Sequence, residues 1–462
     1  MREGELEPVS LADALTEGWS YRTRENHAKR MIMTAVSPAV RGAGWGKILN
    51  DEPLSRSALL AALVGVARNS AQGLVLSFSH DDYLNVGGGV QNCVGDEQAA
   101  LARQGWSYLH LCPNEPKPLL GRYTEASEVT CIANLDGARL GVVVLADLIE
   151  ALGQVRSEGV LLRSVVHHML GFAPEHILAV IEQCDAAYPP LVWIHDLFTL
   201  CPTATMLRNQ VTFCNAPPVS SAVCGVCHAG RDRFEHVKRM RRFFARTRPV
   251  VLAPSATILN FWLEHAGYEH AQTHVLPPCE ISFERDAPAY MRDEPLKVGF
   301  LGAPHFHKGW FAFESLARWH ARDPRYEFVH LGWETLDVPN VKFIRTAVTY
   351  QDRSAMVRTA VEQGIHVAIN WSMCFESFSF TMYEALAAGA YVLARRGAGN
   401  VSRAMMSTFA GRGSTVGSEI ELSALFEEGG IREMVEQSRR QYGTLSYSNQ
   451  TGGVLVDGGT GA

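Results

Sequence analysis

The stretch Cys374-Phe-Glu-Ser-Phe-Ser-Phe-Thr-Met-Tyr-Glu-Ala-Leu-Ala-Ala-Gly389 joins a predicted strand to a predicted helix and carries two glutamates. The preceding segment, Gly364–Trp371, is a short apolar run with β-branched residues, which indicates a buried strand. After Ser379, apolar residues recur at helical spacing and a glycine stands near the stop, which indicates a helix. Glu376 is therefore expected in the strand-to-helix turn, and Glu384 about two turns into the helix.

The two glutamates flank the predicted N-terminus of that helix. Backbone N–H groups in the first turn of a helix have no partner within the helix and attract anions. An anion site between two carboxylates suits a ligand with phosphate in its middle and hydroxyl-rich groups at both ends, and a nucleotide sugar is such a ligand. The alternative is an ordinary amphipathic helix that carries two glutamates by chance.

The composition is that of an ordinary globular protein. Of the 462 residues, 47% are apolar and 19% charged, and the length suits two domains plus extensions. The net charge of −6 gives no electrostatic reason to expect nucleic acid as a partner. No apolar run reaches the ~20 residues that span a bilayer, and the acidic start, Met1-Arg-Glu-Gly-Glu-Leu-Glu7, is unlike a secretory signal. We therefore expect a cytoplasmic protein whose ten cysteines are reduced or bound to metal.

Predicted strands alternate with predicted helices in two parts of the chain. The strand candidates of the first part are Leu74–Ser79, Trp106–Leu111, Leu140–Val144, Val160–His167, Pro190–Ile194 and Val250–Pro254. Those of the second part are Leu296–Leu301, Tyr326–Leu331, Val341–Ile344, Ile365–Asn370 and Tyr391–Ala394. Such alternation predicts an α/β fold with two Rossmann-like, doubly wound parallel sheets.

The predicted division of the chain follows from this alternation. We expect an N-terminal extension at 1–70, a first Rossmann-like domain at 71–290, a second at 291–445 and a flexible, glycine-rich tail at 446–462. The extension contains a helix candidate, Ser57–Ala67. The helical segment Glu419–Tyr442 is a candidate to cross back to the first domain.

The glutamate pattern resembles that of the retaining glycosyltransferases of the GT-B fold, in particular the large family numbered four. These enzymes carry Glu, seven residues, Glu, then a small-residue helix ending in Gly and a strand. The resemblance implies that Glu376 lies by the transferred sugar and that Glu384 holds the ribose hydroxyls of the donor. Where the family usually has Gly, this chain has Ser379, whose N–H remains available. The N–H groups of Ser379, Phe380 and Thr381 would then bind the donor phosphates.

A run of three glycines, Gly87-Gly-Gly89, lies between the first predicted strand and a predicted helix. Glycines there let the backbone approach a ligand closely, although the run lacks the spacing of a dinucleotide fingerprint. The resemblance implies that Gly88 and Gly89 face the donor phosphates or the acceptor. A flexible turn is the alternative.

Lys308-Gly309 follows the strand predicted at Leu296–Leu301, on a loop punctuated by glycine. A lysine in this place can reach a diphosphate leaving group as a compact positive charge. The family it resembles has the same Lys-Gly pair but usually also an Arg where this chain has Ala303. His305 and His307 are candidates for the second cation, and a surface lysine is the alternative interpretation of Lys308.

Two further predicted strands end in histidines. His167 and His168 end the strand predicted at Val160–His167, and His195-Asp196 ends the next one. Side chains at the carboxyl ends of parallel strands point into the ligand crevice of an open sheet. The resemblance implies that a histidine at the first of these ends lies near the transferred sugar, so His167 and then His168 are the catalytic candidates. The alternative is a structural histidine with satisfied hydrogen bonds.

Four cysteines follow the His-Asp pair. Two of them, Cys224 and Cys227, are separated by two residues, the spacing that lets one loop give two thiolates to zinc. With Cys201 and Cys214 they match a His-Asp…Cys-Pro…Cys…Cys-x-x-Cys pattern found in a subset of the glycosyltransferases that the chain resembles. Structural zinc is our preferred interpretation over reduced thiols, and a redox dithiol ranks third. Catalytic zinc is disfavoured because four thiolates leave no open coordination position.

The segment Arg231–Arg248 contains eight basic residues interleaved with apolar ones. A basic amphipathic helix of this kind can lie on an anionic membrane surface. The alternative is a solvated helix whose apolar stripe packs on the sheet.

Taken together, the sequence predicts a cytoplasmic GT-B glycosyltransferase that moves a sugar, with retention, from a nucleotide-sugar donor to a glycan or lipid-linked acceptor. The resemblance covers roughly residues 74–445. It implies a catalytic step without divalent metal and allows peripheral contact with the inner face of a membrane. The competing hypotheses are another two-domain Rossmann enzyme, such as a nucleotide-sugar epimerase or a phosphorylase, and a non-catalytic relative that binds sugars.

Overall fold

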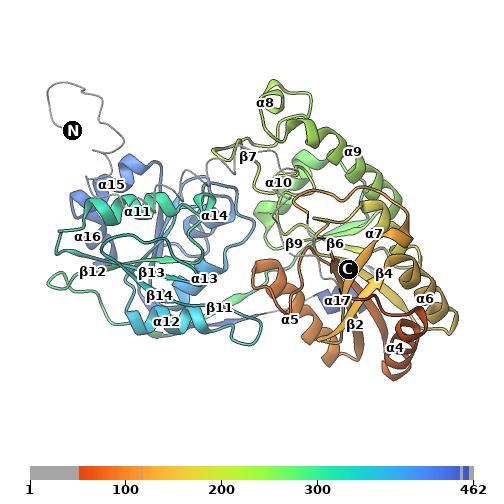
Figure 1. Ribbon diagram of the computed structural model, residues 1–462. Coiled ribbons are helices and arrows are strands. Elements are labelled where there is room, and N and C mark those ends of the chain that lie inside the picture. Colours follow the sequence, from red (N-terminus) through yellow and green to blue (C-terminus); the bar gives the residue numbers. More distant parts are fainter. Residues whose placement is uncertain (1–50, 116, 448–450, 457–462) are drawn as a thin grey trace.

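The computed structural model describes residues 51–115, 117–447 and 451–456, and within them the chain forms two α/β domains that lie side by side (Figure 1). Each domain is built on its own sheet. Most of the extension predicted at 1–70, and parts of the tail predicted at 446–462, lie outside the described residues.

The first domain has an eight-stranded sheet in the order β10-β9-β6-β5-β1-β2-β3-β4. From β10 to β2 all neighbours are parallel, and β3 and β4 add an antiparallel edge. The strands are β1 (Gly73–Phe78), β2 (Trp106–Pro113), β3 (Thr130–Leu135), β4 (Ala138–Val144), β5 (Leu162–Val166), β6 (Leu191–Trp193), β9 (Val250–Ala253) and β10 (Gln272–Val275). A two-stranded hairpin, β7 (Leu207–Arg208) and β8 (Thr212–Phe213), lies apart from this sheet.

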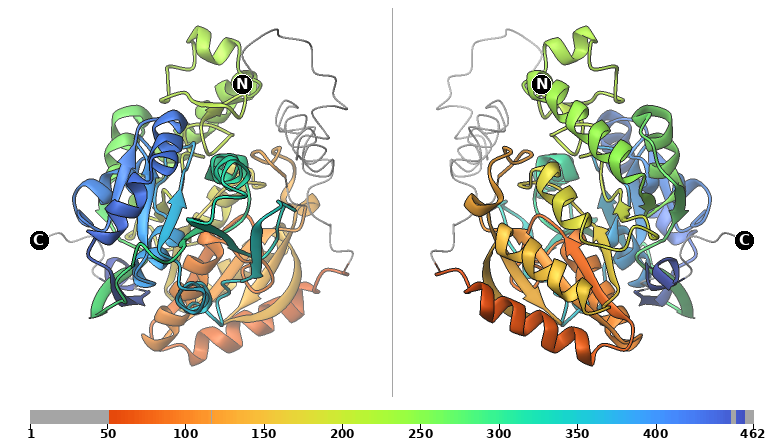
Figure 2. Two further views of the ribbon diagram at one scale, coloured as in Figure 1. Left: turned by 90° about the vertical axis from the view of Figure 1, so that its left-hand side faces the viewer. Right: turned by 90° about the vertical axis from the view of Figure 1, so that its right-hand side faces the viewer.

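Helices cover both faces of the first sheet. Successive residues of a strand point to opposite faces, so each strand contributes side chains to two separate cores. On β1, Leu74, Leu76 and Phe78 belong to one core, whereas Val75 belongs to another. The helices of the domain are α4 (Arg56–Asn69), α5 (Gly89–Arg103), α6 (Leu145–Ser157), α7 (Pro174–Ile181), α8 (Ala222–Gly225), α9 (Gly230–Thr247), α10 (Ala256–Ala266) and the short 3-10 helix η2 (Ala126–Glu128). The larger core holds residues from α4, α6, α7, α9 and α10, and the smaller one holds residues from α5. Helix α4 runs along the outside of this domain (Figure 2).

The second domain has a six-stranded, all-parallel sheet in the order β14-β13-β12-β15-β16-β17. The strands are β12 (Leu296–Leu301), β13 (Tyr326–Gly332), β14 (Val341–Arg345), β15 (Val367–Asn370), β16 (Tyr391–Arg395) and β17 (Gly413–Val416). Its helices are η3 (Phe306–Lys308), α11 (Trp310–Trp319), α12 (Ala355–Gln363), α13 (Phe380–Ala387), α14 (Asn400–Met406), α15 (Glu419–Glu427) and α16 (Gly430–Glu436). In sequence order the strands are arranged 3-2-1-4-5-6, the order of dinucleotide-binding domains.

This strand order fixes where a ligand can bind. In such sheets there is one place in the strand order where the connections on its two sides run in opposite directions. A crevice opens next to this place, at the carboxyl ends of the strands, and ligands bind there. In the second sheet that place lies between β12 and β15, and in the first sheet it lies between β1 and β5. Lys308 follows β12, Glu376 follows β15, and Gly87–Gly89 follows β1. The predicted α/β class with two Rossmann-like domains is confirmed by this topology.

The chain passes between the domains twice. β11 (Glu280–Asp286) leads from the first domain to the second and pairs antiparallel with β18 (Gln441–Ser446) on the return. The last helix, α17 (Thr451–Val456), lies against α5 in the first domain, although it stands at the other end of the sequence (Figure 1). There Arg163 Nη1 donates a hydrogen bond to the Leu455 carbonyl oxygen at 2.5 Å.

Three expectations need correction. The segment Glu419–Tyr442 does not cross back, because Leu422, Phe426 and Ile431 lie in the core of the second domain. β18 and α17 make the crossing instead, so the described part of the predicted flexible tail includes a helix whose Leu455 is buried. The first sheet is also not wholly parallel. No helix in the described part of the chain combines the length and apolar character that a membrane crossing requires.

Candidate functional site

Lys308 and Glu376, predicted separately from the sequence, form an ion pair at the crevice of the second sheet. The Lys308 Nζ lies 2.7 Å from Glu376 Oε1, and the Ser372 hydroxyl donates to the same oxygen at 2.6 Å. Two further contacts tie the loops together, since the Met373 N–H donates to the His307 carbonyl oxygen at 2.9 Å and the Ser372 hydroxyl oxygen lies 3.1 Å from that carbonyl oxygen. The loops after β12 and β15 therefore hold the lysine and the carboxylate as one unit.

Glycine is required where these loops meet. Gly309 has a φ of +82°, and a Cβ there would lie 2.0 Å from the Trp371 carbonyl oxygen. A side chain at this position would therefore push the two loops apart, and with them Lys308 and Glu376.

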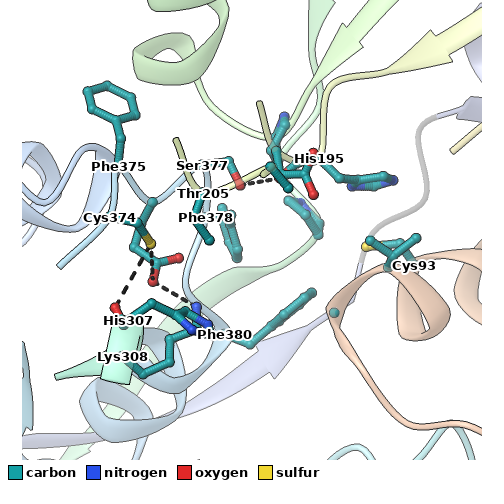
Figure 3. Close-up of a pocket in the computed structure, with 17 residues that line it drawn as sticks. Cys93, His195, Thr205, His307, Lys308, Cys374, Phe375, Ser377, Phe378 and Phe380 are labelled. Carbon is teal, nitrogen blue, oxygen red and sulfur yellow. Dashed lines mark hydrogen bonds and ion pairs between the residues drawn. The ribbon is translucent and has the colours of Figure 1, made fainter. Parts of the chain in front are cut away.

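The ion pair lines a cavity of about 250 Å³ between the domains, which we call the Lys308 cavity (Figure 3). Glu376 is 6% exposed, whereas the Lys308 side chain is 44% exposed and opens into the cavity. Desolvation disfavours the ammonium, but Glu376 outweighs it and raises the pKa of Lys308 above its ordinary value. The cavity therefore has a permanent cation in its wall.

The predicted helix N-terminus is present as α13, which begins at Phe380. Ser379 is its N-cap, and its hydroxyl accepts a hydrogen bond from the Met382 N–H at 3.3 Å. Among the described residues, the backbone N–H groups of Phe380 and Thr381 donate to no backbone carbonyl oxygen. The serine that replaces the usual glycine thus caps the helix and leaves the anion-binding N–H groups available.

A second helix N-terminus meets the first. α5 begins at Gly89 after the glycine run, and its N-cap, Gly88, offers no side chain to the N–H groups of the first turn. A Cβ on Gly89 would lie in ordinary contact, 3.7 Å from the Phe380 ring, so the start of α5 in the first domain lies beside the start of α13 in the second. Because each helix start carries a partial positive charge, the meeting point of α5 and α13 favours an anion.

A larger cavity, of about 470 Å³, lies on the other side of this meeting point and is called the Glu384 cavity. Gly89 and Phe380 line both cavities. Glu384 is 2% exposed, and burial raises its pKa to about 7 although the nearby Arg353 opposes this shift. The exposed ring of Trp333, which follows β13, lines the same cavity.

The domains touch through specific polar contacts around the two cavities. The Ser377 hydroxyl donates to the His195 carbonyl oxygen (Figure 3), and the Ser255 hydroxyl donates to the Ser377 carbonyl oxygen at 2.8 Å. On the far side, Arg353 Nη2 lies 3.2 Å from Asp96 Oδ2. The described arrangement therefore brings both domains against the cavities.

The two histidines predicted as catalytic do not line the Lys308 cavity. His167 is 1% exposed; its Nε2 lies 3.1 Å from the buried Glu97 carboxylate, and its Nδ1 lies 3.0 Å from His195 Nε2. His168 Nε2 lies 3.1 Å from Asp196 Oδ2. His195 and Asp196, which contact the histidine pair, line the cavity instead, and the contact of His167 or His168 with a sugar stays a prediction.

Sequence reasoning missed several residues of these cavities. His195 and Asp196 were identified as strand-end residues but given no role, and Arg353 and Trp333 were not considered. A signal existed for three of them, since His195 and Asp196 follow β6 and Trp333 follows β13 at the carboxyl edge of a sheet. Nothing local marks Arg353. Of the two candidates for the second cation, His307 lines the Lys308 cavity.

The four cysteines predicted to bind zinc border one small cavity, which is lined by the segment 201–214 together with residues in and around α8 and the start of α9. Arg233 also borders it, and its Nη1 donates to Cys224 Sγ at 2.9 Å. Burial raises the pKa of Cys201 to about 11. In the described ranges, no three or more His, Cys, Asp or Glu side chains are grouped so that they could hold a metal ion. The side chains as placed therefore do not form a zinc site, and zinc binding stays a prediction.

Comparisons with known proteins find likeness in structure but not in sequence. No protein-family model matches the chain, and no curated protein matches its sequence. Among similar solved structures, HepE from Anabaena in complex with UDP-glucose has 11% identity over 79% of this chain and 93% of its own, with a TM-score of 0.43. An alpha-glucosyltransferase in complex with UDP and DNA has 11% identity, coverage of 80% and 96%, and a TM-score of 0.43. A glycosyltransferase from Rickettsia africae has 10% identity, coverage of 79% and 91%, and a TM-score of 0.43. With TM-scores below 0.5, this likeness assigns no activity to the chain.

Proposed function

We propose that the chain is a glycosyltransferase that takes a sugar from a nucleotide-sugar donor. The observation that carries this proposal is the meeting of two helix N-termini, at Gly89 and Phe380, between two cavities of different character. A diphosphate placed there would interact favourably with both helix dipoles. Its nucleoside would extend into the Glu384 cavity and its sugar into the Lys308 cavity. The proteins named above, which include glycosyltransferases and a UDP-glucose complex, are in keeping with this proposal.

On the nucleoside side, Glu384 is the proposed partner of the ribose hydroxyls. A carboxylate accepts hydrogen bonds from two neighbouring hydroxyls, and such a bond stabilises its ionised form. Trp333 offers an aromatic face against which a base can stack. Arg353, held by Asp96, adds a positive charge beside Glu384.

On the sugar side, the chemistry is electrostatic. As the bond between the anomeric carbon and the diphosphate breaks, negative charge grows on the departing diphosphate. Lys308 and the N–H groups of Phe380 and Thr381 would stabilise that charge without a divalent cation. Glu376 orients the sugar and keeps Lys308 in place. The contacts between the domains exclude water that would otherwise hydrolyse the donor.

The acceptor, in this proposal, is a glycan or a lipid-linked molecule, and the anomeric configuration is retained. Retention is tested by proton NMR of the first product formed, because the coupling at the anomeric position distinguishes the two outcomes. The resemblance to family four supports retention, and an inverted product would contradict it.

Peripheral contact with a membrane is part of the same proposal. Helix α9 lies on the outside of the first domain (Figure 2) and exposes Arg231, Lys238, Arg241, Arg242 and the ring of Phe234. Such a face suits anionic lipid headgroups. Sedimentation with vesicles that contain phosphatidylglycerol should capture the protein, phosphatidylcholine vesicles should not, and Arg241→Glu with Arg242→Glu should abolish capture.

The donor hypothesis is tested by thermal shift with UDP, ADP, GDP and CDP. One of them at 100 times its Kd should stabilise the folded protein by about 2.7 kcal/mol. The shift should fall in Glu384→Ala and persist in Glu362→Ala, which changes an exposed glutamate on α12. No shift with any nucleotide would contradict donor binding, and binding without turnover would favour a non-catalytic sugar-binding relative.

A further inference from the structure

Asp196 is the acidic residue that the first domain presents to the Lys308 cavity, among the described residues of its lining. It follows β6 at the carboxyl edge of the first sheet, and its side chain is 37% exposed. The Lys308–Glu376 pair comes to the same cavity from the second domain. A ligand in the cavity would therefore have a carboxylate on each side.

The Asp196 carboxylate is held by one donor on each oxygen. Its Oδ1 accepts the Phe198 N–H at 2.8 Å, and its Oδ2 lies 3.1 Å from His168 Nε2. The His168 Nδ1 accepts the Leu170 N–H at 3.0 Å, so the ring donates from Nε2, which points at Asp196. This arrangement fixes the direction of the carboxylate and leaves each oxygen a further lone pair for a ligand.

Two of the histidines near Asp196 are uncharged at neutral pH. Burial lowers the pKa of His80 to about 3, and it lowers the pKa of His195 well below its ordinary value. Although burial opposes ionisation of Asp196, the neighbouring His168 and the Phe198 N–H lower its pKa to about 2. Asp196 is thus a fixed anion with the uncharged rings of His80 and His195 nearby, which suits an uncharged group that can donate a hydrogen bond.

We propose, on the basis of the glycosyltransferase function above, that Asp196 accepts a hydrogen bond from the attacking hydroxyl of the acceptor. The acceptor oxygen forms a bond to the anomeric carbon while the bond from that carbon to the diphosphate oxygen breaks. The diphosphate leaves with the bonding electron pair, and the hydroxyl proton passes to it. A phosphate with a pKa near 6 is a stronger base than this carboxylate, so Asp196 orients the hydroxyl and does not keep the proton.

The placement of Asp196 also restricts the acceptor. A phosphate or carboxylate at the attacking end would face like charge from Asp196, whereas a sugar hydroxyl would not. His168 becomes a positioning residue, since it acts on the acceptor only through Asp196.

The experiment separates acceptor contact from donor binding. UDP-glucose, ADP-glucose and GDP-mannose are offered with water or free glucose as the acceptor, and release of diphosphate is followed. Binding of each nucleoside diphosphate is measured by calorimetry. We expect Asp196→Asn to lower kcat roughly 10- to 100-fold, as for loss of a hydrogen bond to a charged group, while the Kd of the diphosphate changes less than about twofold. Asp196→Glu should retain more activity than Asp196→Asn.

Asp185→Asn is the matched control. The Asp185 Oδ1 accepts a hydrogen bond from the Ala187 N–H at 3.0 Å, and the Asp196 Oδ1 accepts one from the Phe198 N–H in the same way. Unlike Asp196, Asp185 lines neither cavity. The activity of Asp185→Asn should equal that of the wild type, whereas His168→Gln, whose amide can still donate, should fall between wild type and Asp196→Asn. Equal kcat in Asp196→Asn and wild type would overturn the acceptor role and leave the proposed function standing. If Asp196→Asn lost affinity for the diphosphate in parallel with kcat, the acceptor role would also be overturned, because Asp196 would then contact the donor. A wild type that neither binds nor consumes any donor would overturn both proposals.

Discussion

Replacing Glu384 by glutamine should stabilise the protein without ligand, and the gain should grow with pH. The buried carboxyl group holds its proton more tightly in the folded state, where its pKa rises from 4.5 to about 7. Below pH 4.5 the group is neutral in both states and costs nothing. As pH rises toward 7, the unfolded chain loses this proton first, so the folded state becomes relatively less stable.

The magnitude follows from the two pKa values. At about 1.4 kcal/mol per pKa unit, ionised Glu384 costs the folded state about 3 kcal/mol above pH 7, and less than about 1 kcal/mol at pH 5. Glutamine has a similar shape and no charge to desolvate. The variant should therefore melt at a temperature some 6–12 °C above the wild type at pH 8.5, for a domain of 150–250 residues.

The assay is thermal melting of both proteins from pH 5 to pH 8.5, without nucleotide. Glu362→Gln, at an exposed position of α12, is the control and should leave the difference near zero throughout. Glu384→Gln should at the same time lose the stabilisation by the nucleoside diphosphate that wild type shows. A difference in melting temperature that does not change with pH would refute the reasoning, because no proton would then be linked to Glu384.

Three further predictions concern other parts of the site. Lys308→Ala should lower kcat roughly 100-fold or more, because it removes the cation that faces the leaving group. Lys342→Ala, at an exposed position of β14, should leave kcat unchanged, and steady-state kinetics distinguish the two variants. Gly309→Ala should lower the melting temperature far more than Gly397→Ala: both glycines have a φ of +82°, but a Cβ at Gly397 meets nothing within 4 Å. Metal analysis of protein purified without chelator should find about one zinc per chain if the predicted cysteine site forms, and its absence would remove that prediction.

Much of the local structure was predictable from the sequence, since five of the six strands of the second domain were predicted from short runs, and only β17, Gly413–Val416, was missed because it is not an apolar run. β12 was predicted with its observed bounds, Leu296–Leu301, and the helix start after Ser379 was found from spacing alone. The local pattern of apolar residues does not show which strands are neighbours in the sheet. Lys308 and Glu376 were predicted as separate residues, and they become an ion pair only because β15 lies beside β12.

The histidines also show that a residue's position can depend on a partner that is distant in the sequence. His167 and His195 both follow parallel strands, so both were candidates for the crevice. His195 lines the Lys308 cavity and His167 does not. His167 is instead bonded to Glu97, a buried residue of α5 that lies 70 positions away in the sequence. No periodicity or spacing marks such a partner. Asp196 was likewise visible as a strand-end residue, but not as part of the cavity that Lys308 lines.

The return of α17 to the first domain has a consequence for synthesis on the ribosome. The strands and helices of the first domain are complete when β10 has emerged, yet Arg163 must wait for the carbonyl of Leu455. At 5–20 residues per second, the intervening segment takes roughly 10–35 s to make. During that interval the nascent first domain lacks the buried Leu455 side chain, so synthesis of α17, rather than completion of the domain's own sheet, sets the moment when the domain is fully packed.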